Sequence, residues 1–133
     1  MQRALYGLAM ISARAGDRLT NVTKSDIVSS TMEPANELYV GLIRLHILHH
    51  AAEGDLFGFG MIQELRRHGY ELSPGTLYPI LHRMEQRGYI ASRKKTVAGR
   101  VRRVYRATAA GRKALDDAKH KVRELFSELV EGA

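Results

Sequence analysis

Cysteine is absent from the 133 residues of the chain. Its absence excludes disulfide bonds and thiol chemistry, and it is consistent with a reducing compartment. Long apolar runs are missing as well, since no stretch approaches the roughly 18 apolar residues that a membrane-spanning helix needs. We therefore expect a cytoplasmic protein that has no membrane partner.

Motifs that are typical of catalytic sites are also missing. The sequence contains no nucleophile elbow, no phosphate-binding Gly-Lys-Ser/Thr loop and no paired carboxylates in a recognisable frame. Ser73 precedes Pro74 and Gly75, an order that is typical of a helix cap rather than of a catalytic serine. The sequence therefore predicts a protein that is not an enzyme and requires no cofactor.

Acidic residues are few relative to basic ones. Fourteen Asp and Glu residues against 21 Lys and Arg residues give a net charge of +7, and the pI is about 10.0. This surplus indicates a polyanionic partner. It is concentrated, because residues 93–106 contain seven basic residues and no acid: Arg93, Lys94, Lys95, Arg100, Arg102, Arg103 and Arg106. Such a concentration favours nucleic-acid binding over a generally basic surface.

Residues 72–90 predict a short helix whose two ends are marked in the sequence. Ser73 can cap the first N–H groups, Pro74 suits the first helical position, and Gly88 suits a left-handed C-terminal cap. One face is apolar, with side chains at three- and four-residue spacing: Leu77, Ile80, Leu81 and Met84. The other face carries mostly hydrogen-bond donors: Thr76, His82, Arg83, Gln86 and Arg87.

Pro79 interrupts this pattern, because a proline inside a helix removes one hydrogen bond and crowds the carbonyl four residues before it. We therefore expect either a separate tight turn over Ser73–Thr76 or a kink near Leu77. In both cases Thr76 and Tyr78 lie at the N-terminal end of the helix, where free N–H groups and the helix dipole favour a phosphate.

Two further helices are predicted before this one. The first covers residues 36–52 and has an apolar face with two isoleucines beside it: Leu38, Leu42, Leu45, Leu48 and Ala52, then Ile43 and Ile47. The second covers residues 57–68 and ends at Gly69, with four side chains expected in the core: Phe59, Met61, Ile62 and Leu65. Residues 89–96 and 100–107 predict a hairpin that is joined through Val97-Ala98-Gly99.

Three helices followed by a basic hairpin make up a winged helix-turn-helix, a mainly α fold with a small β-hairpin (α+β). This module places its recognition helix, here about residues 76–87, in the major groove and its hairpin on the DNA backbone. The residues that we expect to contact double-stranded DNA lie on these two elements: Ser73, Thr76, Tyr78, His82, Arg83, Arg87, Arg93, Lys94, Lys95, Arg100, Arg102 and Arg103. Alternatively, the hairpin charges form a solvated edge that discourages strand pairing.

The last predicted helix is capped by Thr108 and runs to about Val130. Its apolar residues recur at alternating three- and four-residue steps and predict two heptads of a coiled-coil seam: Leu115, Ala118, Val122, Leu125 and Leu129, widened by Phe126. We expect this seam, together with Leu38, Leu42 and Leu45, to form a homodimer interface. The alternative is that the seam packs on the core of its own chain.

Three histidines of the first helix, His46, His49 and His50, are a candidate site for a divalent metal, because His46 and His50 share a face at four-residue spacing. Glu53 is the nearest acidic candidate ligand. Two alternatives are a pH-sensitive patch and half-exposed polar residues beside an apolar stripe.

Residues 1–33 form an N-terminal extension with three interpretations. It is a secretory signal with small residues at Ala13 and Ala15, an addition ahead of a natural start at Met32, or a short helix over residues 4–14 with a polar linker. The predicted organisation is therefore this extension, a winged helix-turn-helix domain over residues 34–107, and a dimerisation helix over residues 108–133.

The strings SPGTLYPILHRM at residues 73–84, GYI at 88–90 and GRVRRVYRATAAGR at 99–112 resemble the PadR family of bacterial transcriptional regulators. The resemblance covers residues 38–129 and is closest to the compact branch, which has a single C-terminal dimerisation helix. It implies a dimeric repressor of a palindromic operator. The expected effector is a small aromatic or apolar molecule, or a divalent metal, bound at the dimer interface. Alternatives are a non-specific nucleic-acid binder and a metal-responsive sensor that uses His46, His49 and His50.

Overall fold

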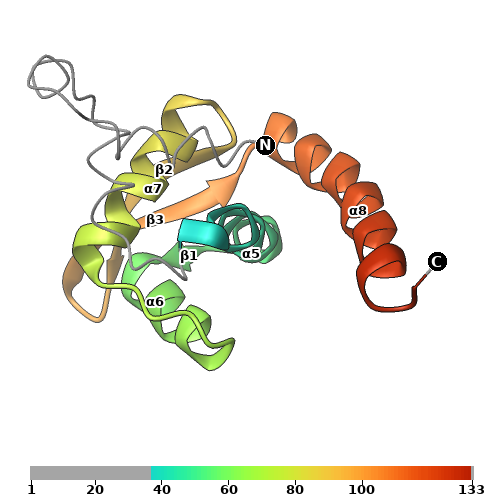
Figure 1. Ribbon diagram of the computed structural model, residues 1–133. Coiled ribbons are helices and arrows are strands. Elements are labelled where there is room, and N and C mark those ends of the chain that lie inside the picture. Colours follow the sequence, from blue (N-terminus) through green and yellow to red (C-terminus); the bar gives the residue numbers. More distant parts are fainter. Residues whose placement is uncertain (1–36, 133) are drawn as a thin grey trace, which may run out of the picture. The chain divides into compact units, whose positions relative to one another are not determined.

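The computed structural model describes residues 37–132. From Val40 onward its elements belong to one unit, in the order α5 (Val40–Glu53), β1 (Leu56–Phe57), α6 (Gly58–Arg67), α7 (Pro74–Gln86), β2 (Ile90–Val97), β3 (Arg100–Ala107) and α8 (Ala109–Leu129) (Figure 1). This order is that of a winged helix-turn-helix followed by one long helix, so the predicted α+β class is confirmed. No helix in this described part has the length and apolar character to cross a membrane. The predicted extension over residues 1–33 lies outside the described residues.

The sheet has the strand order β1-β3-β2, and both pairings are antiparallel. Val97 pairs with Arg100, so the hairpin turns through only two residues, Ala98 and Gly99, at φ angles of 52° and 77°. Two consecutive positive φ angles are typical of the turn that matches strand twist. The hairpin is as predicted, except that β2 begins and ends one residue later. The strand β1 was not predicted, because two residues are too few to show a period.

The core lies where α5, α6 and α7 cover the sheet. Its largest fully buried side chains come from all of these elements: Ile43, Ile47, Met61, Leu65, Leu77, Ile80, Leu81, Ile90 and Val104. The prediction that Phe59 is buried is wrong, since its side chain is 58% exposed. The buried positions of α6 are Gly58, Met61, Ile62 and Leu65, which follow helical spacing and turn the neighbouring Phe59 outward.

The ends of α7 agree with the sequence in part. Ser73 occupies the N-cap position, but its hydroxyl caps no backbone N–H and lies 3.4 Å from the hydroxyl of Thr76. At the other end Gly88 has a φ of 84° and donates to Glu85, while Tyr89 donates to Met84. These two bonds form the glycine-terminated cap that was predicted.

The prediction of a separate turn over Ser73–Thr76 is wrong, because α7 runs as one helix from Pro74 through Pro79 to Gln86. Pro79 removes the hydrogen bond to the carbonyl of Gly75, in the first turn. Gly75 is exposed, so solvent can satisfy that carbonyl and the helix can continue.

Candidate nucleic-acid interface

The exposed side of α7 carries most of the donors that were expected there. Ser73, His82 and Arg87 are exposed, and Arg83 is half-buried. Thr76 is the exception, since only 8% of it is exposed. It shares the inward side of α7 with Leu77 and Ile80, so the prediction that Thr76 lies on the donor face is wrong.

Tyr78 lies across the first residue of α6. A β-carbon added at Gly58 would collide with the phenol ring and hydroxyl of Tyr78, so the ring can lie in this place only while residue 58 has no side chain. The ring is 42% exposed, and its hydroxyl lies beside the N-terminal end of α6. Helix N-termini present free N–H groups and a partial positive charge, which favour a phosphate. Tyr78 is therefore placed at a position suited to the DNA backbone.

One face of the hairpin, here called the outer wing face, consists of Arg93, Lys95, Arg102 and Arg106, which the strand register places together. Asp55, directly before β1, forms ion pairs with Lys95 at 2.7 Å, Arg93 at 3.2 Å and Arg106 at 3.3 Å. Hydrogen bonds from Lys95 and Arg93 lower the pKa of Asp55 to about 2. Sequence reasoning missed Asp55, because it lies 38 residues before Arg93.

The opposite face of the hairpin, here called the inner wing face, carries Lys94 and Arg103 directly across from each other. Arg103 donates to Ser92 at 3.0 Å, and the hydroxyl of Ser92 donates to Glu85 of α7 at 2.8 Å. This chain of hydrogen bonds ties the root of the hairpin to the candidate recognition helix. Within residues 37–132, neither Lys94 on this face nor Arg100, which the register places on the same side as the outer wing face, forms an ion pair with an acid. Their charges are therefore available to a phosphate.

Arg44 of α5 adds a third guanidinium group beside two residues of α7. Burial lowers the pKa of Arg44, and the nearby charges of Arg83 and Arg87 lower it further. None of these three arginines has an acidic ion-pair partner among the described residues. Sequence reasoning named Arg83 and Arg87 but missed Arg44, whose position beside α7 depends on helix packing.

Comparison with known proteins identifies the family. A model of the transcriptional regulator PadR-like family matches residues 47–117. The chain belongs to this family. Over 90 residues it is 54% identical to the Transcriptional regulator Rv3488 of Mycobacterium tuberculosis (strain ATCC 25618 / H37Rv), and the match covers 68% of this chain and 84% of that protein. The resemblance that the sequence strings indicated is confirmed.

Solved structures agree with the fold of this PadR-like chain. The crystal structure of a PadR family transcriptional regulator from Eggerthella lenta DSM 2243 aligns with a TM-score of 0.63 and 28% identity, covering 80% of this chain and 92% of that one. The PadR-like regulator BC4206 of Bacillus cereus strain ATCC 14579 gives a TM-score of 0.64 at 25% identity, covering 73% and 99%.

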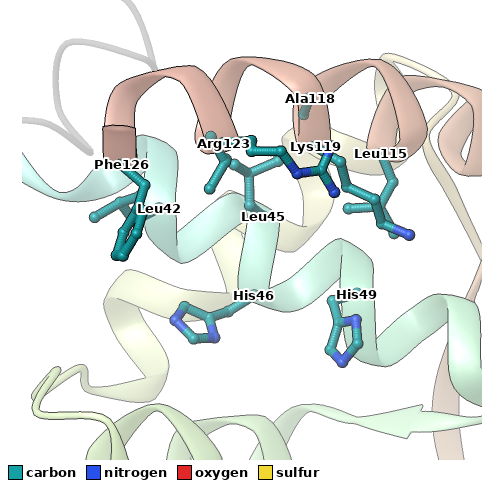
Figure 2. Close-up of a pocket in the computed structure, with 10 residues that line it drawn as sticks. Leu42, Leu45, His46, His49, Leu115, Ala118, Lys119, Arg123 and Phe126 are labelled. Carbon is teal, nitrogen blue, oxygen red and sulfur yellow. The ribbon is translucent and has the colours of Figure 1, made fainter. Parts of the chain in front are cut away.

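An apolar groove of about 530 Å³ runs between α5 and α8 of the PadR-like chain (Figure 2). Its walls contain most of the side chains that were predicted for a dimer interface: Leu42, Leu45, Leu115, Ala118, Val122 and Phe126. Two more predicted residues, Leu125 and Leu129, are also exposed on α8, and Leu38 is exposed before α5. The seam of α8 is therefore only partly covered by its own chain.

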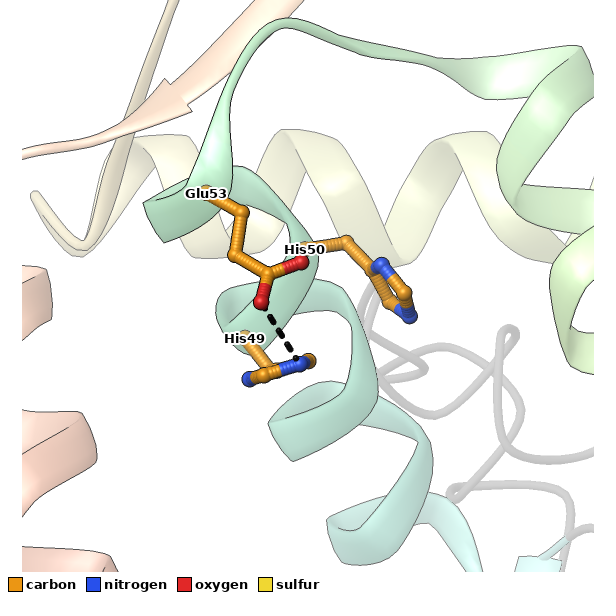
Figure 3. A group of neighbouring side chains, drawn as sticks. All are labelled: His49, His50 and Glu53. Atoms are coloured by element: carbon orange, nitrogen blue, oxygen red, sulfur yellow. Dashed lines mark ion pairs between the residues drawn. The ribbon is translucent and has the colours of Figure 1, made fainter.

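The structure does not group the three predicted histidines, His46, His49 and His50, in one cluster. His46 stacks on His68, with ring centroids 4.6 Å apart, and meets the edge of Tyr70 at 5.6 Å. The structure instead brings together His49, His50 and Glu53, whose potential ligand atoms all lie within 4.8 Å of one another (Figure 3). Spacing along α5 could not show that Glu53, and not His46, lies beside His49 and His50. The position of His46 depends on His68 and Tyr70, which lie outside α5.

Proposed function

We propose that this PadR-like regulator is a repressor that binds a palindromic operator as a homodimer and leaves it when an effector binds between α5 and α8. In this proposal the chain catalyses no reaction and acts in the cytoplasm, where its DNA is. The observation that carries the proposal is that α8 exposes an apolar seam while its N-cap residue, Thr108, is hydrogen-bonded to the carbonyls of Gly88 and Tyr89 directly after α7. In this proposal, these bonds couple dimerisation through α8 to DNA contact through α7.

The DNA contacts follow from the exposed donors. His82, Arg83 and Arg87 would enter the major groove, while Tyr78 and Ser73 would contact phosphates at the N-terminal ends of α6 and α7. The wing residues would contact the backbone on either side. Lys94 and Arg100 are the strongest candidates among them, since no acid among the described residues pairs with them. Arg102 and Arg103 also lack an acidic partner, but Arg102 lies over the ring of Phe57 and Arg103 donates to Ser92. Arg93 and Lys95 would have to share their charge between a phosphate and Asp55.

The homodimer follows from the uncovered seam of α8. Val122 is 45%, Phe126 51% and Leu129 72% exposed, and such apolar residues on one face favour burial against a second copy. A two-fold dimer would place two copies of α7 on one side of the duplex. Paired recognition helices read half-sites about one helical turn apart, which accounts for a palindromic operator.

The connection between α7 and α8 lies at Thr108. Its hydroxyl donates to the carbonyl of Gly88 at 2.6 Å, and its N–H donates to the carbonyl of Tyr89 at 3.0 Å. The same hydroxyl accepts from Gly111 and caps α8 at 2.9 Å. A ligand in the groove that changes the direction of α8 would therefore change the position of α7, and the state with the wrong spacing would release DNA.

A titration of the full chain against fragments of its own upstream region tests the proposal, with a scrambled competitor and at two salt concentrations. We expect tight binding that survives the competitor and saturates at two chains per site. Weak binding that ignores sequence and collapses with salt would leave only an electrostatic interaction and would select the non-specific alternative. Compounds with aromatic or apolar character are the first effectors to screen, since the groove is lined mainly by apolar side chains.

A further inference from the structure

We propose that His49, His50 and Glu53 form a binding site for a divalent transition-metal ion, with Zn²⁺ as the reference ion. Each residue offers one ligand atom, and these atoms all lie within 4.8 Å of one another. Nε2 of His49 is 3.3 Å from a carboxylate oxygen of Glu53. Two ligands of a tetrahedral zinc ion with bonds of 2.0–2.1 Å are separated by about 3.3 Å, so this pair already has the required spacing.

The position of the three residues on α5 explains this spacing. His49 and Glu53 are four residues apart and face the same side of the last turns of α5, while His50 is the neighbour of His49 (Figure 3). Two imidazole nitrogens and one carboxylate oxygen make a ligand set that zinc and its neighbours in the transition series accept. One coordination position is left for water. No cysteine is present in the chain to form a competing thiolate site.

Glu64 of α6 faces the ring of His50. Nε2 of His50 lies 3.6 Å from a carboxylate oxygen of Glu64, which is also held by His68 at 3.1 Å, and its other oxygen is held by Arg67 at 3.2 Å. At 3.6 Å this contact is an ion-pair distance rather than a hydrogen bond. Closing it would give His50 the carboxylate partner that orients a ligating histidine. With Nε2 facing Glu64, Nδ1 of His50 is the nitrogen available to the ion.

His46 does not belong to this site, although its spacing from His50 suggested that it would. Its ring is stacked against His68 and faces Tyr70. This separation makes His46 a matched control, because it is a histidine on the same helix as the three proposed ligands and the proposal gives it no ligand role. The site also needs no DNA, so metal binding and the proposed repressor function can fail independently.

The test is a calorimetric titration of the metal-free full-length chain with Zn²⁺, supported by visible absorption of the Co²⁺-loaded protein as a reporter of coordination. We expect one ion per chain. His50→Gln and Glu53→Gln should each weaken Zn²⁺ binding at least about tenfold, and Glu64→Gln should weaken it roughly 10- to 100-fold. His46→Gln should bind Zn²⁺ as the unmodified chain does. Far-ultraviolet circular dichroism of each variant checks that the fold is retained.

Three results would overturn the proposal. In the first, the triple variant His49→Gln, His50→Gln and Glu53→Gln binds Zn²⁺ as tightly as the unmodified chain. In the second, His46→Gln or His68→Gln abolishes binding while Glu53→Gln preserves it, which would move the ion to the stacked pair. A stoichiometry of one ion per two chains would also contradict a site built from one chain.

Discussion

Replacing Gly111 by alanine tests the joint between α7 and α8. Gly111 is buried in the first turn of α8. A β-carbon there would collide with the carbonyl oxygen of Tyr89 and would lie 3.2 Å from Cδ1 of Leu48. The carbonyl of Tyr89 belongs to the backbone and accepts a hydrogen bond from Thr108, so it cannot move aside as a flexible side chain would. The start of α8 must shift instead, and it loses bonds that Thr108 makes.

The magnitude follows from three contributions. Overpacking at a close contact costs about 1–3 kcal/mol, and each weakened hydrogen bond of Thr108 costs about 1 kcal/mol. Alanine recovers up to about 1 kcal/mol through its helix propensity. We expect a net loss of about 2 kcal/mol, which corresponds to a fall in Tm of roughly 8–16 °C for a unit of this size.

Thermal unfolding followed by circular dichroism measures this fall, with Gly60→Ala as the matched control. Gly60 also lies in the first turn of a helix, but nothing lies within 4 Å of a β-carbon added there. The control should raise Tm, because only the gain in helix propensity remains. If Gly111→Ala melted at or above the temperature of the unmodified chain, the joint would not be the tight contact inferred from the structure.

Three further predictions concern the wing and the dimer. Lys94→Ala should lower the salt slope of DNA binding by about 0.9, and Lys95→Ala by clearly less because Asp55 shares that charge; equal slopes in a fluorescence-anisotropy titration would contradict this assignment. The pKa of Asp55 is about 2 in the folded chain against 3.8 as a reference, so its stabilising effect is complete above pH 4 and is lost as pH falls toward 2. Melting curves of Asp55→Asn should therefore depend less on pH over that range. Phe126→Asp should convert the proposed dimer into monomers in light scattering, and a dimer that persists would place the interface elsewhere.

The helix ends and the hairpin were predictable because each is determined by residues that are close together in the sequence. Gly69 and Gly88 both have positive φ angles, and each stands directly after an apolar period, so the ends of α6 and α7 could be placed from sequence. The basic hairpin was predictable for the same reason, because its two strands adjoin the turn that joins them. The family strings at residues 73–84 and 99–112 fall on these locally determined elements.

The parts that were missed depend on contacts between distant residues. Leu56 of β1 pairs with Tyr105, far along the chain, and Asp55 finds its three partners only when this pairing forms. Thr76 faces inward because α7 continues through Pro79 as one helix, which places Thr76 on the buried side of the helix with Leu77. In the same way, the choice between His46 and Glu53 as neighbours of His50 was decided by the packing of α6 against α5, which no spacing within α5 reveals.

The joint at Thr108 also has a geometrical consequence. A helix of 21 residues is about 30 Å long at 1.5 Å per residue, and its first turn is fixed to the end of α7. Such a helix is a lever arm, and displacing its free end near Leu129 by about 2 Å turns its base through roughly 4° by that length. If an effector displaces the free end of α8 as proposed, a displacement near Leu129 would therefore become only a small rotation of α7. The length of α8 sets the angle through which its base turns for a given displacement of its free end. Shortening the helix by one turn would make the same displacement rotate α7 further.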